Sequence, residues 1–67
     1  MSEKTETIAE IELPYRRVAA VKIAEFDSGM KILRLVLREG RRITQVDLDK
    51  ESAAEIGGYL IQFAEQS

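Results

Sequence analysis

Residues 30–64 carry the pattern of a β-hairpin followed by an amphipathic helix. Residues 32–38 alternate as in a strand, Glu39-Gly40 provides a turn, and residues 41–48 lead back. A period of two places successive side chains on opposite faces of a strand, so the pattern selects the residues that face a core. Asp49 then precedes a segment whose apolar residues recur at helical spacing. These residues predict two antiparallel strands and a helix.

Two further strands are expected before this hairpin. Residues 8–13 alternate, with acidic side chains on one side, and Pro14 ends the strand because proline cannot donate to a sheet ladder. Residues 18–26 are rich in valine, isoleucine and alanine and form the second strand. Residues 27–29 (Asp-Ser-Gly) then predict a three-residue hairpin loop in which the glycine has a positive φ.

The two turns determine which residues lie opposite each other. The first loop places Phe26 opposite Met30, and a two-residue Glu39-Gly40 loop places Arg38 opposite Arg41. Both registers put the same apolar side chains on one face, which we expect to form the core. This predicted core face consists of Val21, Ile23, Leu33, Leu35, Leu37, Val46 and Leu48, joined by Ala9, Ile11 and Leu13 of the first strand.

Asp49 is a suitable N-cap for the helix because its carboxylate can accept hydrogen bonds from free amides of the first turn. At 100° per residue, one apolar stripe forms from Ala53, Ile56, Leu60, Phe63 and Ala64. A helix of about 15 residues spans roughly 22 Å, enough to cross the sheet. The sequence therefore predicts an α+β fold, a four-stranded antiparallel β-meander followed by one C-terminal α-helix packed on one face (β-β-β-β-α).

The chain has 67 residues, which we assign to a disordered tail at residues 1–7 and a single domain at residues 8–66. A domain of this size buries only about 60% of the surface of its unfolded chain and usually needs a disulfide, a metal or a partner. The sequence contains no cysteine and no histidine. Disulfides are impossible and a zinc site is not expected, so we expect a homodimer and no cofactor or metal.

Ten basic and twelve acidic side chains give a net charge of −2. This balance is typical of a cytoplasmic protein and argues against a dedicated nucleic-acid binder, which usually needs a basic excess. No apolar run approaches the roughly 20 residues of a membrane helix. The first residues are polar and charged, unlike a signal peptide, so we expect no membrane association.

The second face of the sheet alternates between basic and apolar rows. Its basic residues are a candidate site for an anion or a single-stranded nucleic acid: Lys22, Arg34, Arg38 and Arg41. In the alternative interpretation the face is an ion-pair ladder, because Glu10 and Glu12 of the first strand would neutralise Lys22 and lie near Arg34. Among aromatic residues, only Phe26 at the edge of this face could stack on a base.

The apolar rows of the same face and part of the helix are candidate interface residues. These are Ile32, Val36 and Ile43 on the sheet, with Gly58 and Tyr59 on the helix. A partner subunit would cover a patch that soluble monomers usually avoid, although scattered exposed apolar residues are also normal. Each helical glycine costs about 1 kcal/mol relative to alanine. Close packing of helix on sheet explains Gly57, whereas Gly58 marks either a helix contact or a tolerated, bent position.

The residue types give little support for catalysis. Without histidine or cysteine, acid–base chemistry would fall to carboxylates, lysine or tyrosine, and no nucleophile motif or glycine-rich phosphate loop is present. Asp47, Asp49 and Glu51 do not have the spacing of a calcium loop. We therefore expect a protein that is not an enzyme. The alternative is an enzyme subunit whose active site is completed by another protein.

The order of elements over residues 8–64 is similar to that of the PC4-like single-stranded-DNA-binding proteins, in which a curved four-stranded antiparallel sheet precedes a helix. The resemblance is one of architecture, and the chain otherwise looks like many small bacterial proteins. The sequence predicts a small non-catalytic accessory or interaction protein, with itself or another protein as partner. The alternative is weak, sequence-independent binding of single-stranded nucleic acid on the open sheet face.

Overall fold

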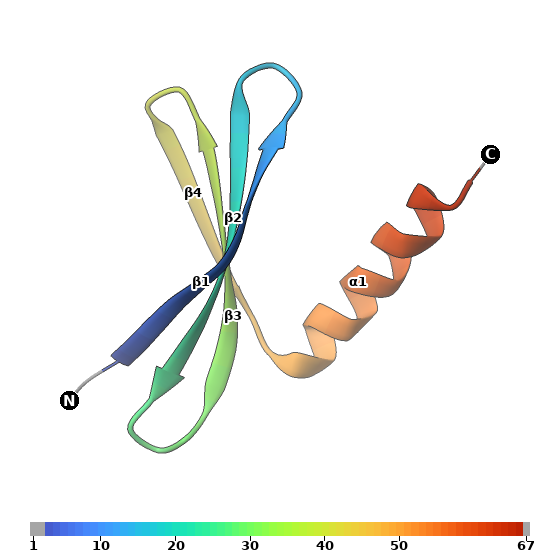
Figure 1. Cartoon of the computed structure of the whole chain (residues 1–67). Helices are drawn as coiled ribbons and strands as arrows, with labels where there is room; N and C mark the ends of the chain where they lie inside the picture. Colours follow the sequence, from blue (N-terminus) through green and yellow to red (C-terminus); the bar gives the residue numbers. More distant parts are fainter. Residues whose placement is uncertain (1–2, 67) are drawn as a thin grey trace.

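The computed structural model describes residues 3–66, which form four strands and one helix. The strands are β1 (Glu3–Leu13), β2 (Arg17–Phe26), β3 (Lys31–Glu39) and β4 (Arg42–Leu48), and the helix is α1 (Lys50–Ala64). Each strand pairs antiparallel with the next, in the order β1-β2-β3-β4, and the sheet is open and strongly twisted (Figure 1). The predicted α+β class and the order of elements are confirmed.

The hairpin between β2 and β3 has the predicted register, with Ile23 opposite Leu33. The Phe26 amide donates to the Met30 carbonyl at 2.9 Å, and the Gly29 amide donates to the Phe26 carbonyl at 2.8 Å. Gly29 has a φ of 89°, as a three-residue loop with a left-handed residue requires. The sequence signal at this turn was therefore sufficient to place two strands correctly.

The β3–β4 register differs from the prediction by two residues. Gly40 and Arg41 form the loop, and Arg38 lies opposite Ile43 rather than opposite Arg41. Gly40 has a φ of 61° and is the first central residue of the loop, a position that favours glycine in a two-residue hairpin. A slip of two residues keeps every side chain on its face. The two faces were therefore predicted correctly, but the cross-strand neighbours were not.

β1 begins earlier than expected, and the prediction of a disordered tail is wrong for residues 3–7. Glu3 lies opposite Phe26 and Thr7 lies opposite Lys22, so this segment pairs with the second half of β2. Its side chains are polar on both faces, so the sequence shows no apolar alternation there. Its backbone nevertheless pairs with β2 and supplies hydrogen-bond partners for that strand. Residues 1–2 of the predicted tail lie outside the described residues. The register changes between Thr7 and Ala9, where Ile8 is the extra residue of a β-bulge.

The helix does not lie across the sheet as expected. α1 contacts β3 and β4 but neither β1 nor β2, and Figure 1 shows it diverging from the sheet beyond its first turns. Ala53 and Gly57 are half-buried, whereas Leu60 is 64% exposed and Phe63 is 73% exposed. The link from β4 is the single residue Asp49, so the helix starts directly at the end of the edge strand.

The face predicted as the core is consequently only partly covered. The buried apolar residues of the described chain are Ala19, Ala20 and Ala24, and no large side chain is fully buried. The radius of gyration is 13.5 Å, compared with about 11 Å for a compact domain of this length. The accessible surface is 5933 Å², compared with about 4,300 Å² for a compact chain of 7.6 kDa. The chain thus exposes about 1,600 Å² more than a compact domain of its mass.

Candidate functional site

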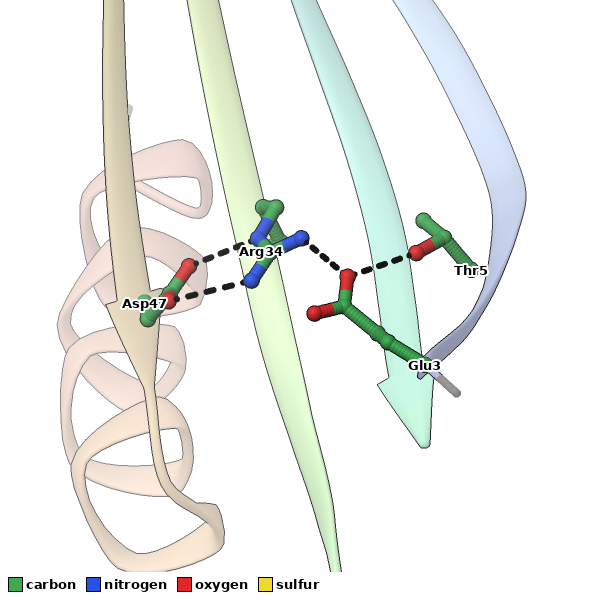
Figure 2. Close-up of polar contacts among 4 residues, drawn as sticks. All are labelled: Glu3, Thr5, Arg34 and Asp47. Carbon is green, nitrogen blue, oxygen red and sulfur yellow. Dashed lines mark hydrogen bonds and ion pairs between the residues drawn. The ribbon is translucent and has the colours of Figure 1, made fainter. Parts of the chain in front are cut away.

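Arg34 is the centre of a polar cluster on the face of the sheet opposite α1 (Figure 2). Its Nε and Nη2 donate to the two carboxylate oxygens of Asp47 at 3.0 and 3.3 Å. Its Nη1 donates to Glu3 Oε2 at 2.6 Å, and the Thr5 hydroxyl donates to the same oxygen at 2.9 Å. The Arg34 side chain is 17% exposed. Asp47 of the adjacent strand β4 and Glu3 of β1, on the far side of β2, therefore hold the guanidinium in a geometry that is bidentate toward Asp47.

The register of β4 and the bulge in β1 together create this cluster. Asp47 lies directly opposite Arg34 in β4. The bulge at Ile8 turns Glu3 and Thr5 onto the Arg34 face, because an extra residue reverses the alternation of the strand before it. Neither feature was predicted, so the sequence analysis missed both acids that bind Arg34. If Gly40 had been taken as the first residue of the β3–β4 loop, the register would have placed Asp47 opposite Arg34.

The electrostatics agree with these contacts. The hydrogen bond from Arg34, and then the one from Thr5, lowers the pKa of Glu3 below its usual range. The hydrogen bonds to Asp47 and Glu3 raise the pKa of Arg34. The charge of Arg34 is therefore already satisfied inside the chain, which favours the ion-pair interpretation of this residue over a free anion site.

The predicted acids of the ion-pair ladder lie elsewhere on β1. Glu10 is opposite Ala20 and Glu12 is opposite Val18, so neither is paired with Lys22 or Arg34. Thr7 is the residue of β1 opposite Lys22. A ladder therefore exists around Arg34, but it is built by different acids from those predicted.

The four predicted anion-binding residues do not form one cluster. Lys22 is opposite Arg34, whereas Arg38 lies four residues further along β3, about 13 Å away on the same face. Arg41 is in the β3–β4 loop. Within residues 3–66, Lys22, Arg38 and Arg41 have no ion pair. Lys22 thus lies beside the satisfied Arg34, whereas Arg38 and Arg41 lie near the β3–β4 turn.

The predicted interface residues are divided between two sides of the molecule. Ile32 and Val36 are half-buried and Ile43 is 62% exposed on the face that carries Arg34. Gly58 and Tyr59 are on α1, which lies on the other side of the sheet, and Tyr59 is 68% exposed. These five residues therefore cannot form one continuous contact within a single surface.

A second exposed apolar surface lies on the helix side of the sheet, and the sequence analysis assigned its residues to the core. We call it the helix-side surface and define it by Ile11, Leu37 and Val46 on the sheet and Ile56, Leu60 and Phe63 on α1. Their exposed fractions are 51%, 37%, 43%, 45%, 64% and 73%, in that order. The periodicity identified all six residues, but it could not reveal that the helix leaves the sheet.

A hollow of about 260 Å³ lies at the base of the helix-side surface, where α1 begins. Its apolar lining comes from Ile23, Leu33 and Leu48 of the sheet and Ala53 of the helix, with Ile32, Lys31, Asp49 and Lys50 at its border. The hollow is open rather than enclosed, and the side chains around it offer few polar groups. It is suited to an apolar side chain rather than to a reacting substrate.

The helical glycines are not explained by packing within the chain. A Cβ placed on Gly57 or Gly58 would meet no atom within 4 Å. The predicted close packing of Gly57 on its own sheet is therefore absent. A methyl group would fit at both positions in the isolated chain.

The described residues contain no group of three or more acidic, histidine or cysteine side chains that could hold a metal ion. Asp47 binds Arg34, whereas the Asp49 carboxylate caps α1 by accepting the Ser52 amide at 2.7 Å. The hydrogen bonds with Ser52 lower the pKa of Asp49. Between residues 3 and 66, no helix is long and apolar enough to cross a membrane.

We expect substitution Arg34→Gln to return the pKa of Glu3 toward its ordinary value of 4.5, because the main hydrogen bond to its charged form is lost. Carboxyl titration followed by NMR measures this change. Since the folded pKa of Glu3 lies below 4.5, its contribution to stability is complete above that pH and is lost as the pH falls through the lowered value. Lys22→Gln is the matched control and leaves the pKa of Glu3 low. An unchanged pKa in Arg34→Gln would contradict the assigned ion pair.

Comparison with known proteins gives a family but no characterised relative. No curated protein and no solved structure matches the chain. The profile of a family of unknown function, DUF6967, matches residues 2–66, which include all four strands and the helix. The chain therefore belongs to the DUF6967 family.

Proposed function

We propose that this chain is a non-catalytic interaction protein of the cytoplasm that works as a homodimer. The observation that carries the proposal is the helix-side surface, which one chain leaves open to solvent on both the sheet and α1. Apolar burial is the main favourable term in folding. In the described chain, however, the buried apolar residues are three alanines, whose side chains are small. Association would supply the burial that the single chain lacks.

The size of the exposed area supports a dimer. Each chain exposes about 1,600 Å² more than a compact domain of its mass, so two chains could remove about 3,200 Å² on association. Obligate homodimers bury roughly 2,000–5,000 Å² in total, and weak encounters bury less than about 1,200 Å². An interface of that size would be in the range of permanent dimers. A small interface would leave most of the apolar surface exposed.

The non-catalytic part of the proposal is supported by chemistry. The sequence contains no histidine or cysteine. The side chains with shifted pKa values are Arg34, Glu3 and Asp49, and each forms hydrogen bonds to neighbours within the chain. Groups that work in catalysis are normally poised toward a site where a substrate can enter. In the described chain these groups instead join β1, β3 and β4 or cap the helix.

To test the homodimer, we compare the solution mass of the unmodified chain with that of Leu60→Glu by light scattering. We expect twice 7.6 kDa for the unmodified chain at both low and high salt, because an apolar contact is weakly screened. Leu60→Glu would place a charge in the interface and weaken the dimer by at least about 100-fold. Because Leu60 is 64% exposed in the single chain, the substitution has little to disturb there.

Gln62→Glu is the matched control for Leu60→Glu. It adds the same charge to the same helix, on the polar side opposite the apolar stripe. The control protein stays a dimer if the apolar stripe forms the contact. A monomeric mass for the unmodified chain at all concentrations would overturn the homodimer. Equal loss of the dimer in both variants would show that helix charge, rather than the helix-side surface, controls association.

Weak binding of single-stranded nucleic acid is a second candidate, because Lys22 and Arg38 share the open sheet face without an ion pair among the described residues. If both contact phosphates, binding of a labelled oligothymidylate falls steeply with salt. Lys22→Gln then lowers the slope of log K against log salt by about 0.7. Lys50→Gln, on the helix, is the control and leaves the slope unchanged. Absence of binding at low salt would eliminate this candidate.

A further inference from the structure

We infer that the two subunits of the homodimer exchange helices, so that α1 of each chain covers the helix-side face of its partner's sheet. The occupant of the helix-side surface is thus a second copy of this chain. The inference rests on the proposed homodimer and adds which two surfaces meet. The inference follows from the direction of α1 and from the apolar faces that the helix and the sheet leave open. The large accessible surface of the chain supports it.

The direction of α1 makes its own sheet a poor partner. One residue, Asp49, joins β4 to the helix, and its side chain bonds the Ser52 amide at 2.7 Å. Turning α1 down onto the sheet would require a change in the backbone angles at or beside this one residue. Exposure also rises along the helix, from the half-buried Ala53 to 73% at Phe63. The second half of α1 diverges from the sheet (Figure 1), so its own sheet leaves that part of the apolar stripe uncovered.

The sheet presents a matching surface that α1 does not reach. Leu37 is near the β3–β4 turn and Ile11 is in β1, a strand that α1 does not contact. Both side chains are on the face that carries Ile23 and Leu33, which border the hollow at the start of the helix. The open apolar area of the sheet therefore continues away from the helix, toward β1 and toward the turn.

A twofold axis can satisfy both surfaces at once. In a symmetric dimer each contact occurs twice, so a helix placed on the partner's sheet implies the reciprocal contact. The 15-residue helix is about 22 Å long, and the nine-residue strand β3 is about 30 Å long, so one helix can lie within the length of the sheet. The exchange covers the stripe of α1 and the sheet face together. Pairing helix with helix alone would leave the sheet face uncovered.

The absence of cysteine from the sequence permits a direct crosslinking test. One variant carries Leu60→Cys on α1, and a second set carries a single cysteine in the sheet, at Leu37, Val46 or Ile11. The two kinds of chain are unfolded together, refolded as a mixture and oxidised, and the disulfides are located by mass spectrometry. We expect a mixed disulfide between Leu60→Cys and at least one sheet position. Gln62→Cys replaces Leu60→Cys in the control mixture and forms much less of it.

A second measurement avoids substitutions in the apolar surface. Carbon-13-labelled and unlabelled chains are refolded together, and isotope-filtered NOEs select methyl contacts between different subunits. We expect such NOEs between Ile56 or Leu60 of one chain and Leu37 or Val46 of its partner. This experiment remains informative if a cysteine variant does not fold.

The outcomes separate the helix exchange from the homodimer itself. A dimeric mass with disulfides only between two Leu60→Cys chains, and no helix-to-sheet NOE, would overturn the exchange while leaving the homodimer intact. An intrachain disulfide in a chain carrying both Leu37→Cys and Leu60→Cys, in a protein of monomeric mass, would overturn both. A mixed disulfide together with intersubunit NOEs supports the exchange.

Discussion

The shape of this protein depends on the single residue between β4 and α1. Asp49 ends the last strand and caps the helix through the Ser52 amide, so the helix takes its direction within one residue of the sheet. A sheet and one helix can form a shared core only if the helix lies over the sheet. Because α1 diverges, the apolar faces of both elements stay open, and the chain exposes 5933 Å². The proposed second copy would cover these open faces.

The parts of the fold that the sequence predicted are those determined by local chemistry. Asp27-Ser28-Gly29 placed β2 against β3 in the correct register, and Asp49 marked the helix start. The β3–β4 register was wrong by two residues, because alternation alone allows Gly40 to stand first or second in its loop. The β1 extension was missed because residues 3–7 are polar on both faces. The direction of α1 depends on tertiary geometry, which periodicity does not contain.

The two sheet faces have different physical characters. On the open face, the β1 bulge and the true β4 register bring Glu3 and Asp47 to Arg34, so a network of polar contacts links β1, β3 and β4. On the helix side, most side chains are apolar and stay partly exposed in the single chain, apart from the Arg17–Glu39 ion pair at one end of β2 and β3. Residue types alone suggested a basic site near Arg34, but the charge of Arg34 is paired within the chain. The exposed apolar residues of the helix-side surface lie on the opposite face. The sequence therefore predicted which residues lie on each face, but not which side chains contact each other there.

The most direct test of the central claim is the melting temperature measured over a wide range of chain concentrations. If a second copy completes the core, folding and association are one reaction, and mass action raises the melting temperature as the concentration increases. We predict this rise at both low and high salt, because the proposed interface is apolar. A melting temperature that does not depend on concentration would show that one chain folds without a partner. That result would contradict the proposal that a second copy covers the helix-side surface.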